Sequence, residues 1–295
     1  MEISSRAKST FFISALIFVC SVIQAQQKYD AQIRETFYFN NIEREYFIKY
    51  PSNYNPDKKY WLIVVVHGGG GNGSNYFLTD GISHELEDKD MDAILVTPSF
   101  SNLDVQASRF PELGEGEFLK QILIQLQNKI NLHKKIFLTG YSRGGQFSHR
   151  FALGNPDLVK ACAPFAAGTW TTPDGTLLVE SIGEITNPES FLSDKSNASK
   201  VPERLKGMFD IRVAEVAGKK ANINAKVVPF LVMCGTLDPR YTIGKQFSNS
   251  LKKQGYNVQT DWPENPHGKK SEYPDEFKKY SKNATEFFLK VMKED

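Results

Sequence analysis

The chain has 295 residues, of which 40% are hydrophobic and 24% are charged, with a formal net charge of +2. This length and apolar content suit one large α/β domain with an insertion. Its lysines are scattered among acidic residues, so the sequence shows neither the basic stripe of a nucleic acid-binding protein nor a sign of an obligatory acidic polymer partner.

The first 25 residues have the order of a secretory signal peptide. Arg6 and Lys8 precede an apolar run over residues 11–23, and Gln24-Ala25 then leads into polar sequence. We predict cleavage after Ala25, a secreted or periplasmic protein, and a mature catalytic domain over residues 26–295.

Two kinds of membrane attachment remain as alternatives to cleavage. The apolar run is short for a transmembrane span, which makes an uncleaved anchor the weaker interpretation. A lipid on Cys20 is disfavoured because Val19 is larger than the residue that usually precedes a lipidated cysteine. We therefore expect no stable membrane anchor.

The body of the chain alternates between predicted strands and helices. Alternating, aromatic-rich sequence over residues 36–40 and 44–50 predicts antiparallel strands at a sheet edge. Continuous apolar runs predict strands covered on both faces at residues 61–66, 92–97, 135–139, 159–165 and 227–234. Helical patterns over residues 117–130, 146–153 and 242–253 lie between them, and a late strand covers residues 257–262. The fold class is thus α/β, with a mostly parallel central sheet flanked by helices.

The alternation of predicted strands and helices stops over residues 169–225, after the sixth strand. The stretch is rich in proline and polar residues, with a short helical pattern over residues 202–217. It is too long for a plain connection, so we predict a lid-like insertion that packs over the carboxyl edge of the sheet.

Gly140-Tyr141-Ser142-Arg143-Gly144 follows a predicted strand and opens a predicted helix. A G-x-S-x-G sequence in that setting is typical of a nucleophile elbow, in which a strained turn presents the serine hydroxyl to substrate. Because such pentapeptides also arise by chance in ordinary turns, the assignment of Ser142 depends on finding the other parts of a catalytic site.

A second glycine-rich segment, His67 to Gly73, follows the strand over residues 61–66. A phosphate-binding loop is disfavoured because no Lys-Ser or Lys-Thr follows the glycines. We predict an oxyanion loop, in which the backbone amide of Gly69 or Gly70 acts together with the amide of Arg143.

An acid and a base follow the serine in chain order. Asp238 comes after a strand end, and His267 comes one helix and one strand later. This order, Ser142 then Asp238 then His267, is that of a hydrolase triad. The alternatives are Asp210 and Asp261 for the acid, and a helix cap for Asp238; the other histidines are His67, His84, His133 and His149.

No cofactor or metal site is predicted, because no ligand cluster is apparent in the sequence. After signal removal the remaining cysteines are Cys162 and Cys234, both in apolar strands. We expect two small, packed thiols, with a disulfide between them as the alternative. The oligomeric state is left open.

With these parts assigned, the chain resembles the α/β-hydrolase superfamily over nearly all of its mature length. Tyr50-Pro51-Ser52-x-Tyr54, the His67-Gly68-Gly69-Gly70 loop and the Gly-Tyr-Ser-Arg-Gly-Gly elbow are similar to those of secreted feruloyl and acetylxylan esterases. Poly(3-hydroxybutyrate) depolymerase-like proteins share this plan. The resemblance implies cleavage of acyl esters on plant polysaccharide or on a polyester.

The chain departs from this family in two ways, at Arg143 and in the 169–225 insertion. We expect a substrate platform at Trp170, or packing of the insertion instead, and cleft-wall positions for Phe100 and Arg109. A serine peptidase of the same superfamily is a rival function, although the chain leaves no room for the large accessory domain of such enzymes. A noncatalytic binding protein with this fold is another.

Overall fold

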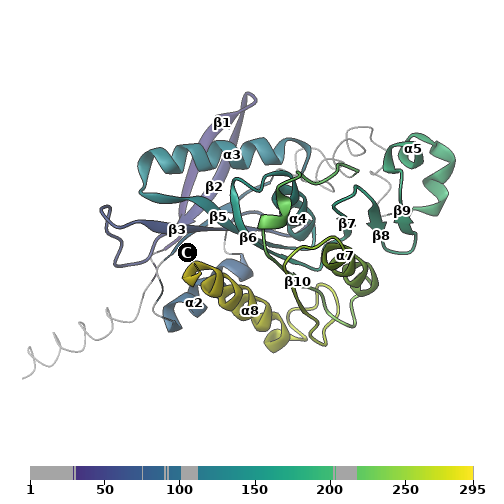
Figure 1. The fold of residues 1–295 in the computed structure, drawn as a ribbon. Coiled ribbons are helices and arrows are strands. Elements are labelled where there is room, and N and C mark those ends of the chain that lie inside the picture. Colours follow the sequence, from purple (N-terminus) through teal and green to yellow (C-terminus); the bar gives the residue numbers. More distant parts are fainter. Residues whose placement is uncertain are drawn as a thin grey trace, which may run out of the picture.

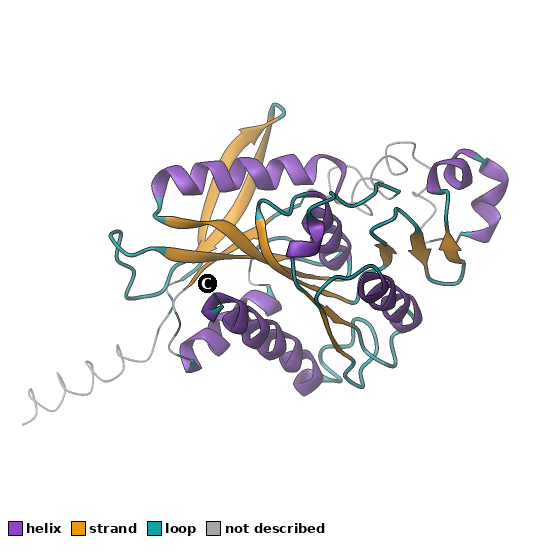
Figure 2. Cartoon of the chain, in the orientation of Figure 1, coloured by secondary structure: helices purple, strands orange, loops and turns teal. Residues whose placement is uncertain are grey.

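The computed structural model describes residues 29, 31–74, 76–89, 91, 93–100, 112–201, 203 and 218–294. One large sheet crosses the molecule and carries helices on both of its faces (Figures 1 and 2). The predicted signal peptide lies outside the described residues. Tyr29, the first described residue, bonds through its hydroxyl to the backbone of Ala93 at the start of a strand.

The large sheet has eight strands in the order β1-β2-β4-β3-β5-β6-β10-β11. β1 and β2 are antiparallel and β2 pairs antiparallel with β4, whereas all later pairs are parallel. The predicted fold class is confirmed. The strands are β1 (Ile33–Phe39), β2 (Ile42–Lys49), β3 (Tyr60–Val66), β4 (Ala93–Pro98), β5 (Leu132–Tyr141), β6 (Val159–Phe165), β10 (Phe230–Met233) and β11 (Val258–Asp261).

The β10 strand is shorter than predicted. Residues 227–234 were expected to form this strand, but Ala225–Val227 forms the 3₁₀ turn η4 and Pro229 has no backbone N–H for the ladder. The strand therefore begins at Phe230.

Side chains of β3 alternate between two hydrophobic cores. Leu62, Val64 and Val66 belong to the core under α3, α4 and α7, while Ile63 and Val65 face the core under α2 and α8. All five are at most 1% exposed. Burying each such side chain contributes about 1.5–3 kcal/mol, so this continuous apolar run can be stable only as a strand covered on both sides.

Helices cover both faces of the sheet (Figure 2). The predicted stripe of α3, which contains Phe118, Ile122 and Leu126, is fully buried. Two helices that the sequence analysis did not predict, α2 and α8, pack against each other on the opposite face. The helices are α2 (Phe77–Asp88), α3 (Glu112–Lys129), α4 (Arg143–Gly154), α7 (Tyr241–Lys253) and α8 (Pro274–Lys293).

The insertion after β6 contains a small antiparallel sheet of three strands. These strands are β7 (Thr169–Thr171), β8 (Leu177–Val179) and β9 (Gly183–Ile185), followed by α5 (Pro188–Ser193) and the 3₁₀ helix η2 (Lys195–Lys200). β7 and β8 lie against α7, and β7 also contacts α4. The helical pattern expected over residues 202–217 falls outside the described residues, apart from Glu203.

Chain order around β3 places a topological switch point at the carboxyl edge of the sheet. From β3 the chain passes to β4 on one side and then to β5 on the other, so the connections diverge between β3 and β5. Open α/β sheets bind ligands at such a point. Val66, the last residue of β3, is the register partner of Gly140 near the end of β5. The His67 loop and Ser142 therefore leave the sheet side by side.

None of the helices in the described part of the chain combines the length and the apolar sequence that crossing a membrane requires.

Candidate active site

Ser142 lies between β5 and α4 in a strained backbone conformation. Its φ of 56° and ψ of −111° fall where residues with a β-carbon are rarely found. The Ser142 amide donates a hydrogen bond of 2.9 Å to the carbonyl of Phe165 at the end of β6, and its carbonyl accepts from Gln146. The turn is thus held by the neighbouring strand and by the first turn of the helix.

The two glycines of the pentapeptide permit this turn because backbone crosses them closely. A β-carbon at Gly140 would lie 2.6 Å from the carbonyl of Gly144, and one at Gly144 would overlap the carbonyl oxygen of Val66. The strand-turn-helix setting expected from the sequence is therefore present, and the elbow is packed directly on β3.

His267 and Asp238 complete a hydrogen-bonded chain with Ser142. His267 Nε2 lies 3.1 Å from Ser142 Oγ, and His267 Nδ1 lies 2.7 Å from Asp238 Oδ2. A carboxylate accepts from Nδ1–H, which leaves the Nε2 lone pair free to accept the serine proton. Residues far apart in sequence thus form the geometry that general-base activation of a hydroxyl requires.

Arg240 binds the second oxygen of Asp238. Asp238 Oδ1 accepts from the Arg240 amide at 2.9 Å and lies 3.2 Å from Arg240 Nη1. Burial opposes ionisation of this carboxyl, which is 1% exposed, but hydrogen bonding and charge from His267, followed by Arg240, lower its pKa below the ordinary value. Arg240 in turn lies 4.0 Å, Nε to Oε2, from Glu180 of the insertion.

Aromatic and amide side chains hold the His267 loop in place. The Tyr141 ring stacks on the His267 imidazole, with centroids 4.9 Å apart, and the Tyr141 hydroxyl accepts a 2.6 Å hydrogen bond from the Gly268 amide. Asn265 is buried, donating to the Pro266 carbonyl and accepting from the Tyr280 hydroxyl at 2.7 Å. Sequence reasoning missed these roles; the position of Tyr141 next to the nucleophile was the one available signal.

The loop after β3 is fixed by a neutral histidine. Burial lowers the pKa of His67, and its ring bridges two backbone groups: Nδ1–H donates to the Gly68 carbonyl at 2.8 Å, and Nε2 accepts from the Phe100 amide at 3.0 Å. Gly70 has a φ of +75°, and the Gly71 amide bonds back to Gly68. These contacts hold the glycines beside the nucleophile.

Of the loop glycines, Gly68 and Gly69 lie against the elbow. A β-carbon at Gly68 would be 3.8 Å from Ser142 Cβ, and one at Gly69 would be 3.1 Å from Arg143 Nη2. Gly70 has no neighbour of this kind within 4 Å. Of the two candidates named from the sequence, Gly69 is therefore the one that lies next to the Arg143 side chain, and it remains exposed.

The expected substrate-contacting residues have other roles where they are described. Trp170 is fully buried and stacks on Phe247 at 4.5 Å, so it is a core residue that anchors the insertion, not an exposed platform. Phe100 is 3% exposed and packs against Phe147, and its amide supports His67, so it is not an open cleft wall. Arg109 lies outside the described residues.

The competing residues have structural explanations. Asp261 accepts a hydrogen bond from Asn283, and His149 is fully buried, bonded to the Gly145 carbonyl and the Thr171 amide. Asp210 lies outside the described residues. Cys162 and Cys234 are buried and unpaired, which confirms the expectation of packed thiols. Within the described residues, no group of His, Cys, Asp and Glu side chains is arranged to hold a metal ion.

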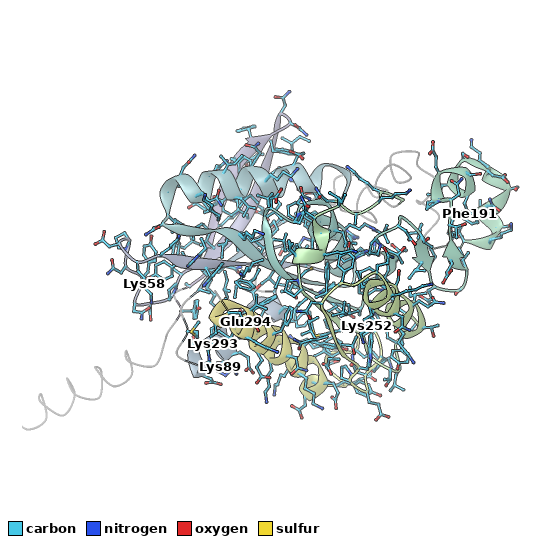
Figure 3. The ribbon with its side chains drawn as sticks, in the orientation of Figure 1. Lys58, Lys89, Phe191, Lys252, Lys293 and Glu294 are labelled. Carbon is cyan, nitrogen blue, oxygen red and sulfur yellow. The ribbon has the colours of Figure 1, made fainter. Side chains whose placement is uncertain are left out.

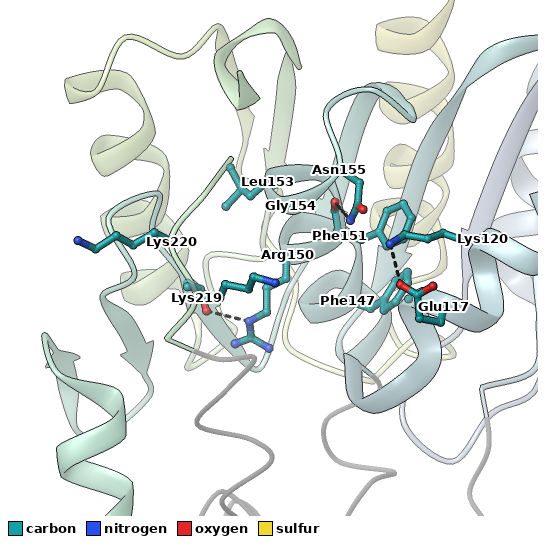
Figure 4. Close-up of a pocket in the computed structure, with 12 residues that line it drawn as sticks. Glu117, Lys120, Phe147, Arg150, Phe151, Leu153, Gly154, Asn155, Lys219 and Lys220 are labelled. Atoms are coloured by element: carbon teal, nitrogen blue, oxygen red, sulfur yellow. Dashed lines mark hydrogen bonds and ion pairs between the residues drawn. The ribbon is translucent and has the colours of Figure 1, made fainter. Parts of the chain in front are cut away.

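A cavity of about 240 Å³ opens beside α3 and α4, but none of Ser142, Asp238 and His267 lines it (Figure 4). Its wall includes Glu117, Lys120, Arg150 and Phe151, together with Lys219 and Lys220, and Lys219 lies next to Arg150 (Figure 4). Phe147 lines this cavity and also packs against Phe100, which connects it to the loop that supports His67.

Comparison with solved structures defines the class of fold. A ferulic acid esterase superposes with a TM-score of 0.63 over 90% of this chain and 99% of its own, at 16% identity. The feruloyl esterase module from Clostridium thermocellum, solved in complex with sinapinate, gives a TM-score of 0.58 over 88% of each chain, also at 16% identity. The chain has the α/β-hydrolase fold.

Sequence comparison gives a narrower relationship. Feruloyl esterase C from Emericella nidulans is 29% identical over 136 residues, which is 45% of this chain and 49% of that protein. The chain spans about half the length of the curated relatives it matches. No protein-family model matches it. The chain is thus similar to feruloyl esterases over the matched stretch.

Proposed function

We propose that the protein is a serine carboxylic ester hydrolase whose triad is Ser142, His267 and Asp238. The observation that carries this proposal is the unbroken hydrogen-bonded chain from Ser142 Oγ through both nitrogens of His267 to Asp238. It meets the strained elbow at one end and a buried, ionised carboxylate at the other.

The reaction proceeds through an acyl-enzyme. His267 Nε2 takes the Ser142 proton as Oγ attacks the ester carbonyl, and Asp238 stabilises the resulting imidazolium. The Arg143 amide and an amide of the glycine loop, Gly69 or Gly70, donate to the oxyanion; such donors are each worth about 3–4 kcal/mol. His267 returns the proton to the leaving alcohol. A water then repeats the sequence and releases the acid. Each step uses groups of the chain itself.

For the substrate, we propose feruloyl or acetyl esters of plant polysaccharide. Support comes from the similarity to feruloyl esterase C and from the fold shared with ferulic acid esterases. A polyester of the polyhydroxybutyrate type is the alternative. The order of charged, apolar and small residues over positions 1–25 supports secretion or a periplasmic location, with cleavage after Ala25.

The decisive experiment compares Ser142→Ala with the wild type on methyl ferulate and p-nitrophenyl acetate, using residues 26–295. We expect kcat to fall at least ~10³-fold, since Oγ forms the covalent bond. Ser148→Ala is a matched control on the same helix: its hydroxyl bonds only to the Gly144 carbonyl among the described contacts, so activity should remain.

Retained activity in Ser142→Ala would contradict the nucleophile assignment. A wild type that is inactive on all acyl esters and unlabelled by a fluorophosphonate would favour a noncatalytic binding protein. Relative kcat/KM on methyl ferulate, acetylated xylan, poly(3-hydroxybutyrate) and a peptide p-nitroanilide then ranks the substrate classes. A preference for the anilide would favour the peptidase alternative.

A further inference from the structure

A hollow of about 750 Å³ lies at the edge of the sheet opposite to the candidate active site. It gathers the amino ends of β3, β5, β6 and β10 and the last turn of α8 (Figure 1). β3 and β5 carry the glycine loop and Ser142 at their other ends. A seven-residue strand spans roughly 23 Å, so the hollow is separate from the candidate active site.

Five lysines line this hollow: Lys59, Lys134, Lys135, Lys160 and Lys226. Among the described lining residues Glu294, labelled at the end of α8 in Figure 3, is the one carboxylate. The lysines are scattered along the sequence, and the whole chain has a formal net charge of only +2. The composition of the chain therefore gives no sign of this local positive charge. The parallel sheet creates it, because the amino ends of parallel strands lie at the same edge.

Three of these ammonium groups are available to a ligand. Lys59, Lys134 and Lys226 are exposed, and none of them forms an ion pair with any residue that the structure describes. Lys135 is held differently, since its Nζ donates to the Pro156 carbonyl at 3.0 Å. Five like charges gathered beside a single carboxylate favour an anion with several negative groups.

The hollow also has a flat ring wall. Trp61 and His133, on the neighbouring strands β3 and β5, stack with centroids 3.7 Å apart and planes only 5° from parallel. Both are partly buried, and Val227, which is 65% exposed, adds apolar surface nearby. The two rings cover each other's facing sides, so what they offer a ligand is the exposed remainder of the stacked pair. Apolar ring surface beside cations suits a ligand that has an apolar ring face and carboxylates on the same unit.

The geometry points to a binding site for a uronate-bearing polysaccharide chain. Its carboxylates pair with the exposed lysines, and the C–H faces of its pyranose rings lie against Trp61, His133 and Val227. The five lysines favour a ligand with several carboxylates, and the aromatic pair and Val227 beside them favour one that carries those carboxylates on rings.

This site goes beyond the proposed function, because it binds polymer without cleaving it. Several weak ion pairs on one polymer raise the effective concentration of enzyme near that polymer, while salt screens each pair. The binding is therefore expected to be multivalent and sensitive to ionic strength, and to leave the hydrolysis of a small soluble ester unchanged.

The test measures retention of the mature protein on immobilised polygalacturonate at low and high salt. Wild type should be retained at low ionic strength and released by salt. The triple variant K59Q/K134Q/K226Q should bind at least ten-fold more weakly. K252Q/K279Q/K282Q is the matched control: it removes the same charge from exposed lysines on α7 and α8 that do not line the hollow, and should bind like wild type. Both variants should hydrolyse p-nitrophenyl acetate normally.

Lack of retention of the wild type, or equal loss in the two triple variants, overturns the site. Polyglutamate has the carboxylates without the sugar rings and should compete poorly; equal competition overturns the assignment to a polysaccharide. Stronger competition by duplex DNA or by phosphatidylglycerol vesicles reassigns the surface to nucleic acid or membrane. Failure here, with intact esterase activity, leaves the proposed function untouched.

Discussion

At the scale of single residues, Asp238 has separate partners for its two carboxylate oxygens. Oδ2 faces His267, while Oδ1 is held by the amide and the guanidinium of Arg240. The carboxylate therefore cannot rotate without losing contacts on both sides. Arg240 lies between this acid and Glu180, so a residue of the insertion approaches the arginine that holds Asp238.

Replacing Arg240 by Met should shift the acid-induced loss of both stability and activity to higher pH. The folded-state pKa of Asp238 is depressed, so its contribution to stability is present above the unfolded pKa of about 3.9 and is lost as pH falls through the folded value. Without Arg240 the folded pKa rises toward the unfolded one, and this contribution shrinks. Urea unfolding and kcat/KM measured between pH 3 and 7 test the shift.

Arg34→Met is the control for that experiment. Arg34 pairs with Glu45 on the edge hairpin and its side chain is 58% exposed, so its loss should leave the acid profile unchanged. The two variants lose the same charge. A profile for Arg240→Met that coincides with that of Arg34→Met would contradict a positioning role for Arg240.

The meeting of Ser142, Asp238 and His267 could be predicted from sequence because their chain order and strand-end positions are constrained by the fold. The sequence could not identify the supporting roles of Arg240, Asn265 and Tyr280, since these roles depend on where three different segments of the chain meet. Trp170 shows the opposite failure. An aromatic residue just beyond a strand end can face either solvent or core, and only the packing of β7 against α7 decides.

At the scale of elements, the elbow joins β5 to α4 with no space for side chains at its glycines. Gly144→Ala should destabilise the protein by about 1–3 kcal/mol or more, because the new methyl group would overlap the Val66 carbonyl oxygen and push α4 away from β3. It should also lower kcat, since Ser142 moves with the helix. Equilibrium unfolding in urea and steady-state kinetics measure the two effects.

Gly154→Ala, at the other end of the same helix, is the matched control. A β-carbon there would meet no atom within 4 Å, and the residue does not have a positive φ. This change should be neutral or stabilise the protein by up to about 1 kcal/mol, through helix propensity. Equal destabilisation by the two substitutions would show that the close approach to β3 is not the reason why position 144 requires glycine.

Element prediction was most successful where one periodicity dominated. The β3 run and the α3 stripe were predicted because their buried positions are occupied by apolar residues at regular spacing. The α8 helix was not predicted, although its buried Phe277, Tyr280, Ala284 and Phe288 follow helical spacing. Its many lysines obscure that stripe in the sequence. The start of β10 was misplaced because the three residues before it, Val227, Val228 and Pro229, continue its apolar run.

At the scale of the whole molecule, the fold does not depend on a cross-link between Cys162 and Cys234. Burial raises the pKa of both thiols, so little reactive thiolate exists in the folded state. The mature protein should have the same Tm with and without dithiothreitol. Ellman's reagent should react with no thiol in buffer and with two in guanidinium chloride. A lower Tm under reduction would contradict unpaired cysteines.

The register of the central sheet sets the accuracy of the candidate catalytic geometry. The glycine loop follows β3, and Ser142 follows β5. The pairing of Val66 with Gly140 fixes the positions of the two relative to each other along the strand direction. A slip of one residue would displace them by about 3.3 Å, more than the length of a hydrogen bond. Substitutions deep in these two strands, far from any substrate, are therefore expected to act as catalytic mutations whenever they alter the ladder. Backbone hydrogen bonds in the core thus fix the position of Ser142 to within a few tenths of an ångström.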